Sequence, residues 1–153
     1  MAVKRLWALG ELTELFPGAA DRDARHLCTR HVSGEGRWMK ESGDRQQFGQ
    51  VRLHVEPAEV ITVRLEHQWP RTVPTAEIDE LDMAVLRGVS ESPSAPPRHL
   101  YGYCLVVDAV EYRAGETTPM TVTLAASRAA LDVLKRGGWD NNDTVAPVLA
   151  KRH

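Results

Sequence analysis

Apolar and polar residues alternate most regularly near the middle of the chain. Residues 49–56 alternate in this way, and the apolar side is supplied by Val51, Leu53 and Val55. A period of two is typical of a half-buried β-strand. Residues 60–65 repeat the alternation after a short break at Pro57. The sequence therefore predicts that these two strands pair as a hairpin.

Other segments also predict strands. Residues 25–32 and 36–41 predict two short strands around a turn at 33–35. Residues 103–112 form a strand whose near-continuous apolar run, 104–107, indicates burial on both faces of a sheet. A last extended segment is expected at 145–149.

Three segments show helical periodicity. Residues 3–16 carry an apolar stripe that ends at Pro17. A second helix is expected at 76–89 after Thr75 as N-cap, with its buried side made by Ile78, Leu81, Val85 and Val89. A third is expected at 120–135, bounded by Thr118-Pro119 and Gly137-Gly138, with Met120, Leu124, Leu131 and Leu134 inward. Between the last two, 91–98 is a loop rich in serine and proline.

The order of these elements indicates an α+β protein with helices on one face of one sheet. We divide the chain into an N-terminal helix and linker, 1–24, and a main domain, 25–150. The first helix either packs on the core of its own domain or docks on a partner, and both interpretations remain open.

Composition narrows the class of protein. The chain has 153 residues, 42% hydrophobic and 26% charged, with a formal net charge of -2. That balance argues against a sequence-independent nucleic-acid clamp, which carries a basic surplus. Cys28 and Cys104 are expected to be reduced thiols, and no segment predicts a signal peptide or a membrane span. We therefore expect a cytoplasmic protein.

Residues 42–47 form a polar loop between two strand-like segments. It is either a plain hairpin connection or a tip that contacts another molecule. The residues around it belong to a longer collinear set of motifs between 25 and 149: Glu35-Gly36, Lys40, Ser42-Gly43, Arg45, Gln47-Phe48-Gly49, Val51, Val73-Pro74, Gly102-Tyr103, Val106-Val107-Asp108, Leu124-Ala125-Ala126-Ser127 and Pro147-Val148-Leu149.

This set resembles domain IV of elongation factor G, the ribosomal translocase of the translational GTPase family. The resemblance implies a four-stranded sheet covered by two long helices, with a left-handed βαβ crossover. Nothing in the sequence matches GxxxxGK[ST], so we expect neither a nucleotide nor any other cofactor. If this sequence is the whole protein, the resemblance implies a stand-alone domain IV without the GTPase domain.

The resemblance also implies a contact surface for RNA. Two tip loops of the family reach transfer RNA and messenger RNA, and their counterparts here are 42–47 and 114–118. The implied contact residues are Ser42, Gly43, Asp44, Arg45, Gln46, Gln47, Arg113, Gly115, Glu116 and Thr117. Asp44 replaces a glycine of the family, and Glu116 stands in a loop that lacks the family's histidine. Two carboxylates repel phosphates, although Arg45 and Arg113 offset them in part.

Few other residues of the sequence are candidates for metal binding or catalysis. His26, Cys28 and His31 have ligand types that suit zinc, with His54 as a further candidate, but on a strand His31 would face away from the other two. We expect no metal site and no catalytic residue. Three acidic residues of the first long helix are expected to form a solvated face: Asp79, Glu80 and Asp82.

Three hypotheses follow. The first is a ribosome- or RNA-associated module related to translation. The second is a protein-interaction or regulatory module that kept the fold and lost the RNA contact, with a protein partner or a second copy bound through the N-terminal helix. The third, an enzyme or metal protein, depends on the cluster of His26, Cys28 and His31 alone.

Overall fold

The computed structural model describes residues 5–17, 24–92 and 95–140. Its main element is a five-stranded mixed sheet with the order β1-β5-β7-β4-β3. The strands are β1 (Arg5–Ala8), β3 (Val32–Ser42), β4 (Arg45–Pro57), β5 (Thr62–Leu65) and β7 (Tyr103–Glu111). β5 and β7 run parallel, and the other neighbours are antiparallel. A second, two-stranded sheet pairs β2 (His26–Leu27) with β6 (Leu100–Tyr101).

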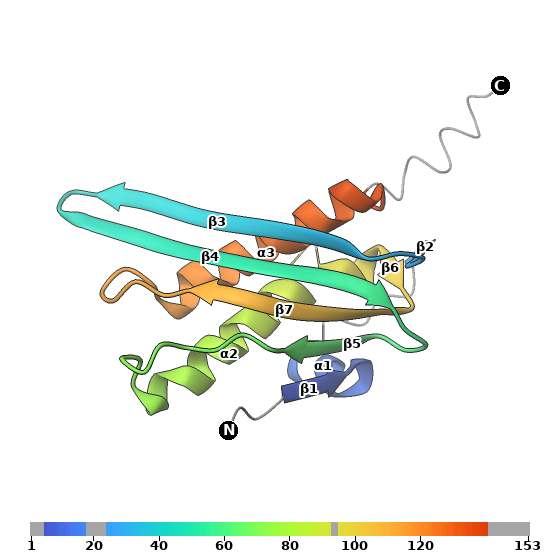
Figure 1. Cartoon of the computed structure of the whole chain (residues 1–153), viewed down its shortest axis with the longest axis horizontal. Coiled ribbons are helices and arrows are strands. Elements are labelled where there is room, and N and C mark those ends of the chain that lie inside the picture. Colours follow the sequence, from blue (N-terminus) through green and yellow to red (C-terminus); the bar gives the residue numbers. More distant parts are fainter. Residues whose placement is uncertain (1–4, 18–23, 93–94, 141–153) are drawn as a thin grey trace.

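The helices cover one face of the large sheet and leave the other face open (Figure 1). They are α1 (Leu9–Leu15), α2 (Thr75–Ser90) and α3 (Pro119–Gly137), together with a 3-10 turn, η2 (Pro96–Arg98). The β3–β4 hairpin is the longest strand pair and projects beyond the helical layer at one end of the molecule. The α+β class is therefore confirmed, with five strands in the main sheet where four were expected.

Helix α3 lies very close to the sheet because glycines line its path. A Cβ at Gly34 would lie 2.7 Å from the carbonyl oxygen of Ala129, and Gly36 and Gly49 also face backbone atoms of α3. The buried side of α3 carries small side chains. These are Ala125, Ala126, Ala129 and Ala130, all 0% exposed. Close backbone approach of this kind requires the absence of a Cβ.

This packing corrects two sequence predictions. The expected turn at 33–35 does not exist, since β3 is continuous and its glycines serve helix packing. The expected inward residues of α3 are also partly wrong: Met120 is 50% exposed, while Leu134 is buried. Leu124 and Leu131 are only half-buried. The predicted buried face of α3 followed the large apolar residues, but the closest contact between α3 and the sheet is made by alanines.

The N-terminal segment begins as a strand, which corrects the predicted helix at 3–16. Residues 5–8 pair with β5, with Trp7 opposite Val63, and the helix begins only at Leu9. The backbone N–H of Ala8 donates to Glu11 Oε1 at 3.1 Å and so fixes this start. Leu12 and Phe16 are buried in the same core as the sheet.

The strand at 60–65 has a different partner from the one predicted. β5 lies between β1 and β7, and β7 separates it from β4. The central place of β7 explains its composition, because Leu105, Val106 and Val107 are 0% exposed and a strand buried on both faces belongs inside a sheet. The apolar face of 49–56 is confirmed: Val51, Leu53 and Val55 are fully buried.

The boundaries of α3 match the local signals. Thr118 caps α3, Pro119 opens it, and Gly138 ends it in the left-handed region with φ 77°. The predicted N-cap of α2 is wrong, because Thr75 is the first residue of the helix and Pro74 takes the cap position without a side-chain hydrogen bond. The 91–98 loop contains η2 at its end.

The predicted segment at 145–149 lies outside the described residues. No described helix is long and apolar enough to cross a membrane.

Candidate functional site

The two loops singled out in the sequence lie together at one end of the molecule. The β3–β4 hairpin turns at Gly43-Asp44, and the β7–α3 loop turns at 113–117 beside it (Figure 1). We call this region the tip. It surrounds an open hollow of about 760 Å³ lined by Glu41, Gly43, Asp44, Arg45, Gln46, Ala114, Gly115 and Glu116.

A few contacts hold the two loops against each other. The backbone N–H of Phe48 donates to the carbonyl oxygen of Glu116 at 3.0 Å. The guanidinium carbon of Arg113 lies 3.6 Å from the centre of the Phe48 ring, and its Nε donates to Glu111 at 2.9 Å. The N–H of Arg113 also donates to the hydroxyl of Thr117 at 2.9 Å. The second loop is therefore closed by its own hydrogen bonds.

The expected contact residues differ in what they can do at the tip. Thr117 is 8% exposed and Arg113 is bound to Glu111 and Phe48, so both shape the loop. Asp44, Arg45 and Gln46 are exposed on the hairpin. Gln46 donates to Glu41 at 2.9 Å. Gly43 and Gly115 adopt φ of 63° and 79°, which suits glycine, and Gln47 and Glu116 are half-buried.

The charge of the tip is close to balanced. Glu41, Asp44 and Glu116 contribute carboxylates, and Lys40 and Arg45 are exposed cations for which the described part of the chain offers no ion pair. Sequence reasoning did not single out Glu41, Ala114 or Lys40 as contact residues. The alternation of the hairpin strands, continued to the turn, would have indicated that they border it.

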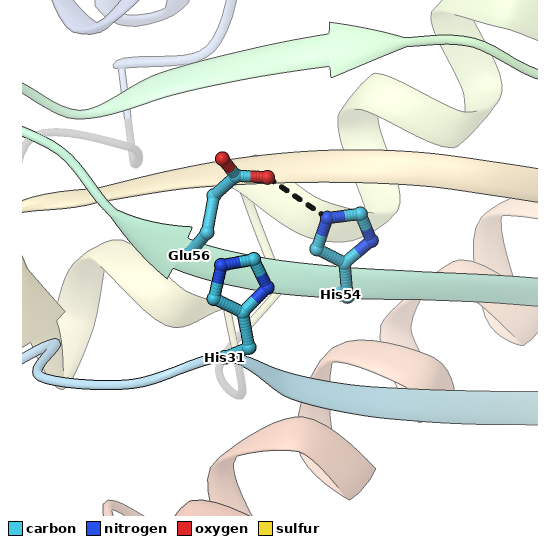
Figure 2. A group of neighbouring side chains, drawn as sticks. All are labelled: His31, His54 and Glu56. Carbon is cyan, nitrogen blue, oxygen red and sulfur yellow. Dashed lines mark hydrogen bonds and ion pairs between the residues drawn. The ribbon is translucent and has the colours of Figure 1, made fainter.

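A second polar cluster lies on the open face of the sheet, far from the tip along the hairpin. Figure 2 shows His31, just before β3, beside His54 and Glu56 of β4. His54 Nε2 lies 3.0 Å from Glu56 Oε1, and His54 Nδ1 lies 2.8 Å from Asp108 Oδ2. The rings of His31 and His54 stack with centres 5.8 Å apart. We call these four residues the histidine cluster.

Hydrogen bonding in this cluster changes two pKa values. Burial alone would lower the pKa of His54, but the carboxylates of Asp108 and Glu56 outweigh it and raise the pKa. The hydrogen bond from His54 lowers the pKa of Glu56. Because each ring nitrogen of His54 faces a carboxylate oxygen, the protonated ring donates to both.

The candidate zinc ligands considered from the sequence, His26, Cys28 and His31, do not come together as a group. Among the described residues, only His31, His54 and Glu56 bring three potential ligand atoms within 4.8 Å of one another. Cys28 is buried, its thiol donates to the carbonyl oxygen of Arg30 at 3.4 Å, and burial raises its pKa. His54 and Glu56 share a strand face at i and i+2, which was the sequence signal for this pair.

A third polar cluster corrects the prediction of a wholly solvated face on α2. Asp82 is only 4% exposed, whereas Asp79 keeps 84% of its side chain exposed. Asp82 accepts hydrogen bonds from three side chains: Arg5 at 2.7 Å, His67 at 2.9 Å and Trp69 at 2.8 Å. Burial alone would raise its pKa, but these bonds outweigh burial and lower it. Asp82 thus ties β1 and the 66–70 segment to α2.

Comparisons with known proteins give a likeness of fold. No family model matches the chain, and no curated protein sequence matches it. Among solved structures, the chain is similar to the crystal structure of ttk003000868 from Thermus thermophilus, with 19% sequence identity and a TM-score of 0.54. The match covers 73% of this chain and 17% of the Thermus protein. The chain thus shares the fold of a part of a much longer protein.

Proposed function

We propose that this chain is a domain IV-like module of the elongation factor G type that contacts RNA on the ribosome through the tip. It works without nucleotide and without GTPase activity. Its place is the cytoplasm, where ribosomes carry out translation. One observation supports the proposal most. The backbone hydrogen bond between Phe48 and Glu116 holds the two loops together as one exposed surface.

The shape of the molecule supports this role. The tip stands at the end of the long β3–β4 hairpin, beyond the helical layer (Figure 1). A surface held away from the body can enter a confined space while the body stays outside it. Loops on a rigid scaffold are also where binding residues are commonly found.

The electrostatics predict weak, salt-sensitive binding. Arg45 is exposed and Lys40 lies nearby on the same hairpin, while Arg113 is already bound to Glu111. Each phosphate neutralised on a single strand lowers the slope of log K against log salt by about 0.7. With one or two cations available, we expect a slope of about -1, shallow for a nucleic-acid-binding protein.

Co-sedimentation with ribosomes and separated subunits across a salt series tests the proposal. We expect saturable pelleting that weakens with salt, and a salt dependence of log K that is shallower by about 0.7 in Arg45→Ala. Arg136→Ala is the matched control, since Arg136 is exposed at the other end of α3 and pairs only with Asp132 among described side chains. Equal loss in both variants, or no pelleting at low salt, would contradict an RNA contact at the tip.

A second candidate function is a protein-interaction module. It is favoured by the exposed leucines of the N-terminal segment, Leu6 at 54% and Leu15 at 46%. Leu12 and Trp7 pack on the chain's own core, so they are not available to a partner in the same way. Binding through leucines would persist at high salt, because apolar burial is not screened. The same salt series therefore separates the two functions.

A further inference from the structure

We propose that the histidine cluster binds one divalent transition-metal ion of the Zn²⁺ class, with His31, His54 and Glu56 as ligands and Asp108 as the residue that orients His54. This site lies on the open face of the sheet and is separate from the tip. It does not depend on the RNA contact, because none of its residues belongs to either tip loop.

The ligands meet because of strand geometry. His54 and Glu56 lie two positions apart on β4 and therefore share a face. Val32 pairs with Val55, so the register carried one residue further places His31 opposite Glu56. Two side chains of β4 and one from the residue just before β3 thus converge (Figure 2).

The distances fit zinc after a small movement. Zn–N and Zn–O bonds of about 2.0–2.2 Å place tetrahedral ligand atoms roughly 3.3–3.5 Å apart. His54 Nε2 and Glu56 Oε1 are already 3.0 Å apart, and all three ligand atoms lie within 4.8 Å of one another. His31 is exposed and stands just outside β3, so it has room to rotate toward the other two.

Asp108 supplies the orienting hydrogen bond that the histidine ligands of metal sites normally make. The β4–β7 register shifts between Arg52 and Leu53, which pair with Ala109 and Val107 and leave Asp108 as the extra residue of a β-bulge. Its carboxylate reaches His54 Nδ1 at 2.8 Å. A carboxylate on the far nitrogen fixes the ring, and the metal would take the place of the Nε2 proton that otherwise bonds to Glu56. Bulges of this kind redirect side chains.

The surrounding charge favours a cation. Glu56, Asp108 and Glu66 provide three carboxylates around the cluster, and the guanidinium groups of Arg64 and of the exposed Arg52 lie on the same face. Arg64 lies 2.7 Å from Glu66 and 4.0 Å from Glu56, so its closest ion pair is outside the ligand set. The ligand side chains remain partly open, with His54 21% and Glu56 31% exposed.

The ligand set also defines the coordination. Two imidazoles and one carboxylate suit zinc, and imidazole also binds copper and nickel. Three protein ligands leave one tetrahedral position for water or for a group from a bound molecule. The ion would also join the start of β3 to β4 and so stabilise the hairpin at the end opposite the tip.

Titration of the untagged full chain with ZnCl₂ alone, followed by calorimetry, tests the proposal. We expect one equivalent of zinc, and a rise in Tm with zinc because the folded state alone presents the site. Asp108→Asn should weaken binding about 10- to 100-fold, the usual effect of removing an orienting partner. His31→Ala should weaken it further, and its exposed position makes loss of folding no concern.

His26→Ala is the matched control, since His26 lies outside the ligand set yet belongs to the sequence-based alternative. It should bind zinc as the unmodified chain does. Failure of the unmodified chain to bind one equivalent, or equal loss in His26→Ala and His31→Ala, overturns the proposal. Imidazole NMR gives a second readout: zinc should shift His31 and His54 and leave His26 unchanged. No RNA is present, so this result is independent of ribosome binding.

Discussion

The tip and the packed body of the molecule use glycine for opposite reasons. At Gly43 and Gly115 of the tip, nothing lies within 4 Å of where a Cβ would stand, and glycine is there because φ is positive. At Gly34 and Gly36 of the body, the same Cβ would collide with the backbone of α3. The glycines of the body are therefore required by close contact, whereas those of the tip are required only by the turns, and the exposed side chains of Asp44 and Arg45 can change without altering the fold.

The largest effect should come from Gly36→Ala in the body. The added methyl group meets backbone atoms of Ala125 and Ala129, which cannot rotate away as a side chain would. We expect a loss of about 3 kcal/mol in the free energy of unfolding. Urea denaturation with an unchanged m-value measures it. A loss below about 0.5 kcal/mol would show that α3 does not lie so close to β3.

Asp82→Asn should have the next largest effect. Asp82 is buried and accepts hydrogen bonds from Arg5, His67 and Trp69. Asparagine keeps part of this hydrogen bonding and removes the charge that balances Arg5, so we expect a loss of about 2 kcal/mol near neutral pH. Asp79→Asn is the control, since that side chain is 84% exposed, and it should change stability by less than about 0.5 kcal/mol.

The lowered pKa of Asp82 predicts that the stability of the protein depends on pH in the acid range. The pKa of Asp82 in the folded protein lies below its ordinary value of 3.8. Its contribution is therefore complete above that ordinary value and is lost as the pH falls through the lowered one. The difference in stability between the unmodified chain and Asp82→Asn should shrink as the pH falls from about 6 to about 2. A constant difference would contradict the charged state assigned to Asp82.

Gly43→Ala makes the same chemical change as Gly36→Ala at the tip. Only the positive φ of 63° opposes the methyl group there, so we expect a loss of about 1 kcal/mol. Gly115→Ala, at φ 79°, should behave alike. If either variant lost as much as Gly36→Ala, the distinction between tip and body would fail.

Arg45→Ala should leave stability unchanged within about 0.5 kcal/mol. Arg45 is exposed and has no ion pair in the described part of the chain. Thermal unfolding of this variant is also the control that its binding experiment needs. A clear fall in Tm would mean that Arg45 supports the hairpin and that its loss cannot be interpreted as a loss of contact.

Much of the fold could be predicted from local signals. The strand at 49–56 follows from its alternation, and the ends of α3 follow from Thr118-Pro119 and Gly138. The order of the strands could not be predicted, because β5 is separated from β4 by β7, a strand that comes much later in the chain. The buried state of Asp82 also depends on distant partners, Arg5 and His67.

The candidate sites also differ in how far the sequence alone could predict them. The 42–47 loop was identified from its polar residues between two strands, whereas its grouping with 114–118 was implied only by the family resemblance, and the structure places the two loops side by side. The histidine cluster was not identified as a unit, since it needs the cross-strand register of β3 and β4 and the bulge at Asp108. Ligands that are distant in sequence cannot be grouped until the pairing of strands is known.

Probing from the tip itself tests the central claim most directly. Cys28 and Cys104 are buried, so a thiol-linked hydroxyl-radical probe can be placed selectively at Asp44→Cys, or at Arg136→Cys as the distant control. With both proteins mixed with ribosomes, we expect cleavage of ribosomal RNA at discrete positions from residue 44 and little from residue 136. Equal cleavage from the two positions, or none from residue 44, would contradict an RNA contact at the tip.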